Sequence, residues 1–83
     1  MYKIYTKENC PWCVKAKQLM KSCGVAYEEL KLGENFTRED LQALLPKTLP
    51  LTVPQIFVYN KRIGGYEGLA EYFENHGIIG TQQ

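Results

Sequence analysis

The sequence has no apolar run that approaches the ~18 residues of a membrane-spanning helix, and Met1 to Tyr5 lack the long apolar region of a secretory signal. It also lacks a strong charge of one sign, since ten basic and nine acidic residues leave a net charge of +1, which argues against non-specific nucleic-acid binding. Repeats and linkers are absent as well. We therefore expect a cytoplasmic, monomeric single domain over residues 1–83, with a flexible tail at about 77–83.

Cysteine is scarce, with three residues in the chain. An odd number argues against the disulfide framework of a secreted small domain, because one thiol would stay unpaired. A chain of 83 residues buries only about 60 to 65% of its unfolded surface, so it needs an economical fold or covalent help from disulfides or a metal. We expect a reducing compartment, in which the cysteines serve as thiols.

The neutral total hides an uneven distribution of charge. Residues 1–27 contain five lysines against Glu8 alone, a net charge of +4, whereas residues 28–83 contain five basic and eight acidic residues, a net charge of −3. The lysines of residues 1–27 either form a solvated face of a helix or attract a small anionic ligand.

The spacing of apolar residues predicts a βαβ unit in the first half. A strand is expected at 2–6. Apolar or small residues at 13, 16, 19, 20 and 23 then form the buried stripe of a helix that begins at Pro11 and stops before Gly24. A second strand at 26–31 should lie parallel to the first, because a helix makes the crossover.

The second half predicts a helix, a hairpin and a final helix. Thr37 is the expected N-cap of a helix with Asp40 in the capping-box position, and Pro46 ends it. A strand at 55–59, a turn at 60–61, a short strand at 62–63 and a helix ending near Gly77 follow. The order βαβ, α, ββα predicts an α/β fold with a four-stranded mixed sheet and helices on both faces.

The segment Cys10-Pro11-Trp12-Cys13 lies where the first strand gives way to a helix. Cys10 falls at the N-cap and Pro11 at the first helical position, so a thiolate at Cys10 would face helix N–H groups and the positive end of the helix dipole. Lys7 could add a positive charge. These effects favour the thiolate, which is the nucleophilic form.

Cys13 follows three residues later on the same side of the helix, within reach of a disulfide. It also begins the buried stripe and is therefore shielded. We expect Cys10 to attack a disulfide sulfur and form a mixed disulfide, which Cys13 or an external thiol then resolves.

A zinc site is the competing interpretation of the two cysteines. Only Cys23 and His76 remain as further ligands, and neither has a zinc-finger spacing, so no metal is expected. Cys23 is interpreted as an inert, semi-buried core thiol, and His76 as a residue at a helix C-terminus and not a catalytic base.

The chain resembles the glutaredoxin family in three segments that follow in order: YTKENCPWC at 5–13, TVPQIF at 52–57 and IGGYEGL at 63–69. The resemblance implies the thioredoxin fold, no permanently bound cofactor, glutathione as co-substrate, and reduction of protein disulfides and glutathione mixed disulfides. It implies that glutathione contacts Lys7, Trp12, Thr52, Val53, Pro54, Gly65, Tyr66 and Glu67, while Pro11, Trp12 and Pro54 support the catalytic pair Cys10 and Cys13.

Physical arguments support two of these segments. Pro54 opens a strand and is cis in the family, so that the Val53 backbone could pair with an extended peptide; an ordinary trans proline is the alternative. The glycines before Tyr66 either let backbone amides at 66 and 67 meet a carboxylate or simply form a turn.

The chain departs from the family at three places. Trp12 replaces the usual tyrosine, and Tyr66-Glu67-Gly68 brings a bulky ring and a longer acid to the glutathione site. Leu51 stands where an arginine or lysine is common, so Lys47 or Gln42 would have to replace that carboxylate contact.

The primary hypothesis is a glutathione-coupled dithiol oxidoreductase and electron carrier. One alternative is a glutaredoxin-like donor to ribonucleotide reductase that thioredoxin reductase reduces. The other is a scaffold in which two chains share an iron–sulfur cluster through Cys10 and glutathione, which Pro11 disfavours by analogy with the family.

Overall fold

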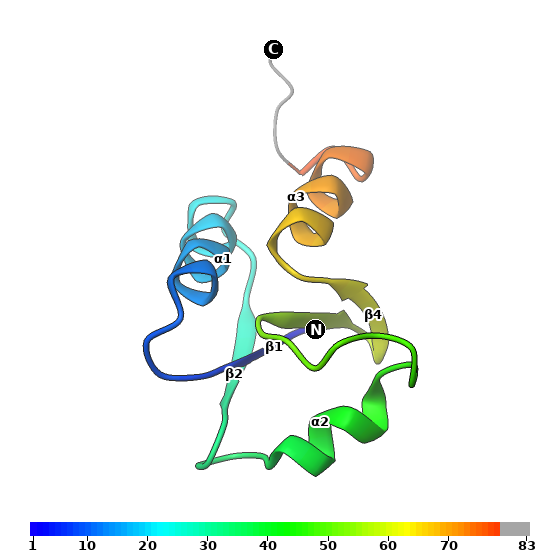
Figure 1. The fold of residues 1–83 in the computed structure, drawn as a ribbon. Helices are drawn as coiled ribbons and strands as arrows, with labels where there is room; N and C mark the ends of the chain where they lie inside the picture. The colour runs from blue at the N-terminus through cyan, green and yellow to red at the C-terminus, as the bar shows by residue number, and fades with distance from the viewer. Residues whose placement is uncertain (79–83) are drawn as a thin grey trace.

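The computed structural model describes residues 1–78. Seven elements follow along the chain (Figure 1): β1 Tyr2–Thr6, α1 Pro11–Ser22, β2 Tyr27–Lys31, α2 Arg38–Leu44, β3 Gln55–Val58, β4 Lys61–Gly64 and α3 Tyr66–Asn75. This is the predicted order βαβ, α, ββα.

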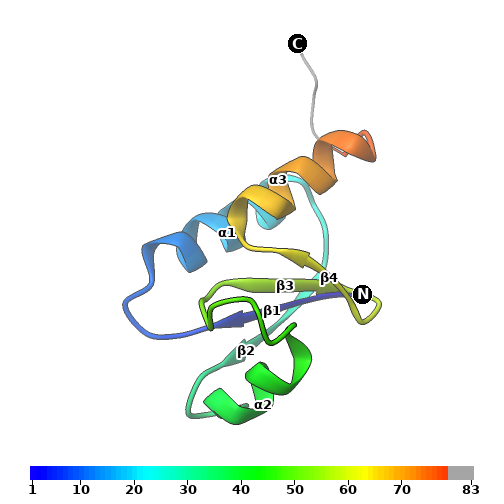
Figure 2. The ribbon, with the colours of Figure 1, turned by 45° about the vertical axis from the view of Figure 1, so that its right-hand side comes forward.

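One mixed sheet has the strand order β2-β1-β3-β4. β1 pairs in parallel with β2, and the pairs β1–β3 and β3–β4 are antiparallel. Helices α1 and α3 lie along one face of the sheet and α2 covers the other (Figures 1 and 2). The predicted thioredoxin-type arrangement, with helices on both faces, is confirmed.

The two faces of the sheet have separate cores, because successive residues of a strand point to opposite sides. Ile4 and Ile56, which are opposite each other in β1 and β3, face the core shared with α1 and α3. The next residue along β3, Phe57, instead joins the core under α2. The first core also contains Ala16, Met20, Leu69 and Phe73, and the second Phe36, Leu41 and Leu45.

The helix boundaries follow the predicted signals. α1 stops just before Gly24, which takes a left-handed φ of 72°. Thr37 and Asp40 form the expected capping box at α2, and Leu45 is already extended ahead of Pro46. The predicted stripe of α1 also faces the core, although its residues 19 and 23 are only partly buried.

The hairpin between β3 and β4 differs from the prediction by one residue. Tyr59 was expected to end the strand, but Tyr59 and Asn60 form the turn, with positive φ angles of 51° and 68°. Two such residues make the tight turn whose twist matches that of the flanking strands. Lys61 therefore belongs to β4, and Tyr59 is 80% exposed.

Part of the predicted tail belongs to the folded structure. The N–H of Ile78 donates to the carbonyl oxygen of Phe73 at 2.8 Å, and its side chain packs against the core under α1 and α3. Residues 79–83 of that prediction lie outside the described residues. Within residues 1–78, no helix has the length and apolar character needed to cross a membrane.

Candidate redox site

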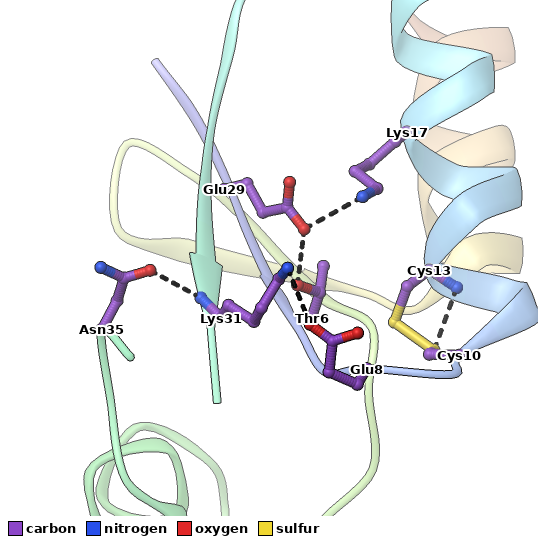
Figure 3. A network of polar contacts seen from close by, with 8 residues as sticks. All are labelled: Thr6, Glu8, Cys10, Cys13, Lys17, Glu29, Lys31 and Asn35. Atoms are coloured by element: carbon purple, nitrogen blue, oxygen red, sulfur yellow. Dashed lines mark hydrogen bonds and ion pairs between the residues drawn. A yellow bond between two sulfur atoms is a disulfide. The ribbon is translucent and has the colours of Figure 1, made fainter. Parts of the chain in front are cut away.

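Cys10 and Cys13 are joined by a disulfide at the start of α1 (Figure 3). Cys10 is the N-cap, with an extended backbone, and its sulfur accepts a hydrogen bond from the Cys13 N–H at 3.1 Å. Pro11 occupies the first turn, where its missing N–H leaves nothing unpaired. The exposed fraction is 8% for Cys10 and 2% for Cys13, so Cys10 is the more accessible of the two.

The segment before β3 lies beside the disulfide. Because β1 pairs with β3, the end of β1 that leads to Cys10 lies next to the start of β3, with Tyr5 opposite Gln55. The Cys10 Sγ is 3.9 Å from the carbonyl oxygen of Val53, and the Val53–Pro54 peptide bond is cis, as the resemblance implied. The structure thus brings Val53 and Cys10 together across 43 residues of chain.

An aromatic wall stands beside this segment. The rings of Trp12 and Tyr66 are tilted against each other with their centroids 5.6 Å apart, which joins the first turn of α1 to the start of α3. The Lys15 ammonium lies 4.6 Å from the centroid of the Trp12 ring. Trp12 is nevertheless 52% exposed, so it offers a flat apolar surface next to the disulfide.

Two hollows share the lining residues Thr52 and Val53. The first is lined by Lys7, Arg38 and the apolar residues Leu32, Phe36, Leu41 and Leu51. It therefore presents two cationic side chains over an apolar floor. Lys47 and Gln42, which the sequence suggested as carboxylate contacts, do not line it.

Arg38 was missed as a site residue because the sequence placed it only in the first turn of α2. Leu41, three residues later, is 2% exposed and lines the same hollow. Residues three apart lie on the same face of a helix. The position of Arg38, three residues before the apolar Leu41, was therefore the sequence signal that could have placed it beside the hollow.

The second hollow, of about 500 Å³, runs along the aromatic wall. It is lined by Trp12, Tyr66, Glu67 and the two residues Thr52 and Val53, together with Pro54, Arg62, Ile63, Gly64, Gly65 and Gly68. All the glutathione contacts that the resemblance implied, except Lys7, line this hollow. Arg62 is a second cationic residue that sequence reasoning did not single out.

A polar network lies on the side of the disulfide formed by β1, β2 and α1 (Figure 3). The Glu29 carboxylate accepts hydrogen bonds from the Thr6 hydroxyl at 2.8 Å and from the Lys17 ammonium at 3.0 Å. Partial burial works to raise the pKa of Glu29, but these two hydrogen bonds and the charges of Lys17 and Lys31 outweigh it, so the pKa is lowered. Glu29 and Lys17 line a third hollow together with both cysteines.

Lys31 and Glu8 form a second ion pair beside this network, with 3.0 Å between Nζ and Oε2. The hydrogen bond and the charge of Glu8 raise the pKa of Lys31. Two of the lysines near the disulfide are therefore paired with carboxylates, which leaves Lys7 without an ion-pair partner among residues 1–78.

The other two candidate residues lie away from the disulfide. Cys23 is a free thiol packed against the core, as predicted. His76 is the C-cap of α3, stacks on Tyr72 with 4.0 Å between ring centroids, and has its Nδ1 2.8 Å from the Tyr72 carbonyl oxygen. In the described part of the chain, no three His, Cys, Asp or Glu side chains cluster as metal ligands would.

Comparison with known proteins relates the site to one family. The family model described as Glutaredoxin matches residues 3–63. Hybrid peroxiredoxin hyPrx5 of Haemophilus influenzae is 44% identical over 70 residues, which cover 84% of this chain and 28% of that protein. Glutaredoxin 1 of Rickettsia conorii is 43% identical over 67 residues, which cover 80% of this chain and 65% of that protein.

The chain thus spans less than two thirds of the length of these two relatives. Among solved structures, reduced glutaredoxin of Escherichia coli superposes with a TM-score of 0.78 at 33% identity, covering 94% of this chain and 98% of the other. The family match includes the disulfide, the cis proline and the sheet that joins them. The chain therefore belongs to the glutaredoxin family.

Proposed function

We propose that this domain is a thiol–disulfide oxidoreductase in which Cys10 is the attacking thiolate and Cys13 the resolving thiol. The observation that carries the proposal is the N-cap position of Cys10, whose sulfur already accepts the Cys13 N–H at 3.1 Å. That N–H and the dipole of the twelve-residue helix α1 stabilise negative charge on this sulfur. Cys13 is almost fully buried, so an incoming disulfide meets Cys10 first.

The reaction balances over two exchange steps. The Cys10 thiolate attacks one sulfur of the substrate disulfide, forms a mixed disulfide and releases the other substrate sulfur as a thiolate. The Cys13 thiol loses its proton to solvent and attacks the Cys10 sulfur, which closes the Cys10–Cys13 disulfide and releases the second substrate thiolate. The substrate gains two electrons and the domain loses two, which an external thiol must return.

Glutathione is the thiol that the two joined hollows suit best. It is an extended tripeptide with a carboxylate at each end, and the two hollows, which share Val53, each have a cationic lining residue. We assign the glycyl carboxylate to Lys7 and Arg38, which line the same hollow. The backbone of Val53, which lines both hollows, suits the cysteinyl residue, and the N-terminus of α3 at Gly65 suits the γ-glutamyl end.

The aromatic wall adds a surface against which the tripeptide can pack. The Trp12 ring preserves the apolar contact that a tyrosine makes in the family. The bulky Tyr66 ring, one of the departures from the family, contacts Trp12 and lines the hollow without filling it. We infer that the departure at Tyr66 reshapes the γ-glutamyl site and does not close it.

The substrates and the compartment form part of the same proposal. Protein disulfides and glutathione mixed disulfides are the proposed electron acceptors, with ribonucleotide reductase as a candidate. A monomer suffices, because one chain supplies both cysteines. A reducing cytoplasm is the proposed setting, since the pair must be returned to the dithiol after each turnover.

The decisive experiment compares two reductants of the same disulfide substrate. Steady-state turnover is measured with glutathione plus glutathione reductase, and separately with thioredoxin reductase, both coupled to NADPH oxidation. Turnover with glutathione supports the proposal. Turnover with thioredoxin reductase alone would refute glutathione coupling, and no turnover with either would refute the oxidoreductase assignment.

A further inference from the structure

We propose that Arg62 is a specificity-determining residue that pairs with the α-carboxylate of the γ-glutamyl end of glutathione. The inference rests on the proposed glutathione-coupled function and identifies a side chain that neither the sequence motifs nor the family match single out. Arg62 lies in β4, two residues before Gly64, and lines the hollow that Tyr66 and Glu67 also line.

Arg62 is held in place by a buried amide. Its Nε donates to the Gln55 Oε1 at 2.9 Å, and Gln55 is only 2% exposed. A buried side chain has few rotamers available, so this bond fixes the direction of a guanidinium that would otherwise be mobile. The two Nη groups then remain available for the fork-shaped contact that arginine makes with a carboxylate.

The same amide connects Arg62 to the segment beside the disulfide. Gln55 Nε2 donates to the Thr52 Oγ1 at 3.3 Å, and Thr52 lines both hollows. The chain Arg62–Gln55–Thr52 therefore holds the cation at a fixed place relative to Val53, whose carbonyl oxygen is 3.9 Å from the Cys10 sulfur. A ligand whose thiol reaches Cys10 has its γ-glutamyl end directed toward Arg62.

The charges around this hollow match a zwitterionic end group. No carboxylate among residues 1–78 forms an ion pair with Arg62, so its charge is not neutralised within the described structure. Glu67 lines the same hollow with the opposite charge. The γ-glutamyl residue carries an α-carboxylate and an α-ammonium group on one carbon, which Arg62 and Glu67 can meet respectively.

The neighbouring Lys61 provides a matched control. It is exposed, belongs to the same strand and carries the same charge, but successive strand residues point to opposite faces. Lys61 accordingly lines a separate hollow with Tyr59 and His76. Arg62→Gln and Lys61→Gln remove the same charge, and only the first affects the proposed contact.

The test measures how fast each thiol reduces the Cys10–Cys13 disulfide of the purified protein. Glutathione is compared with cysteinylglycine, which shares the Cys-Gly part and lacks the γ-glutamyl residue. Both rate constants are expressed per thiolate, because the free α-ammonium group of cysteinylglycine changes the thiolate fraction. Their ratio then gives the γ-glutamyl contribution for each protein. We expect Arg62→Gln to lower that ratio about fivefold to tenfold, the upper part of the range of an ordinary hydrogen bond, because Arg62 is exposed to solvent. Lys61→Gln should leave the ratio within about twofold of the wild-type value.

Arg62→Lys refines the test, because it keeps the charge but not the guanidinium fork, and should fall between Arg62→Gln and the wild type. An unchanged ratio in Arg62→Gln, or an equal loss in Lys61→Gln, would overturn the role of Arg62 while leaving glutathione coupling intact. A wild-type protein that does not prefer glutathione over cysteinylglycine would refute the glutathione site itself. Thermal unfolding of each variant shows whether the fold is retained.

Discussion

At the scale of single residues, Cys10 and Cys13 have the same chemistry but unequal surroundings. The Cys10 sulfur accepts the Cys13 N–H and lies 3.9 Å from the carbonyl oxygen of Val53, a residue that lines both hollows, whereas Cys13 faces the interior as the first member of the buried stripe of α1. The roles proposed for the two cysteines therefore rest on their positions. Cys23 offers an internal comparison, since it belongs to the same stripe but lies at the other end of the helix.

These positions predict the effects of single substitutions. Cys13→Ser should retain reduction of glutathione mixed disulfides, which needs only the Cys10 thiolate, and lose reduction of protein disulfides, which needs the resolving thiol. Cys10→Ser should lose both activities, and Cys23→Ser should keep both. Parallel assays with a glutathionylated peptide and an intramolecular protein disulfide measure this. Equal retention of the two activities in Cys13→Ser would contradict the assigned roles.

Between elements, the Thr6–Glu29–Lys17 contacts join β1, β2 and α1 on the side of the disulfide shown in Figure 3. The ion pair is partly exposed, so its charge interaction is screened by solvent. The lowered pKa of Glu29 still links it to stability: the folded state favours the carboxylate, so its contribution is present above the unfolded pKa and is lost as pH falls through the folded pKa.

Glu29→Gln should therefore lower the free energy of unfolding at pH 7 and lose this difference from the wild type as the pH falls below about 4. Urea unfolding of both proteins at pH 7, 5 and 3 measures the effect. Glu28→Gln is the matched control, because Glu28 is the preceding residue of β2 and is exposed. A difference between Glu29→Gln and the wild type that persists unchanged at pH 3 would rule out the ionised carboxylate as its source.

Elements were predictable where a local signal determines them. Pro11, Gly24 and the Thr37–Asp40 box fixed helix ends because each acts on the backbone within a few residues. The predicted position of the hairpin turn was wrong by one residue. Tyr59 continues the strand-like pattern of the sequence, but its φ is positive and it belongs to the turn.

Contacts between elements that are distant in the sequence could not be predicted from such local signals. A Cβ at Gly68 would collide with the carbonyl oxygen of Ile63, so α3 approaches β4 more closely than any side chain at that position permits. The sequence identifies Gly68 as part of a motif but not as this packing contact. Arg62 was missed for the same reason, since only the folded sheet brings β4 to the hollow that Thr52 and Val53 also line.

At the scale of the whole molecule, the division of charge along the chain does not coincide with the division of charge in space. Lys7 belongs to the basic residues 1–27, but Arg38 and Arg62 belong to the acidic remainder. Folding gathers these three cations around Thr52 and Val53. Lys7 and Arg38 line the first hollow, and Arg62 lines the second. The two hollows together therefore form a cationic groove, although the chain carries a net charge of only +1.

A cationic groove should make the reaction with an anionic thiol sensitive to salt. Glutathione carries two carboxylates and one ammonium group, whereas 2-mercaptoethanol carries no charge besides its reacting thiolate. Raising the ionic strength from about 20 to 500 mM shortens the Debye length from roughly 20 Å to about 4 Å, so the reduction of the disulfide by glutathione should slow by roughly a factor of two to five. The rate with 2-mercaptoethanol should change less, because only its thiolate is attracted. Stopped-flow measurement of both rates checks this, and equal salt dependence for the two thiols would show that the gathered cations do not act on the ligand.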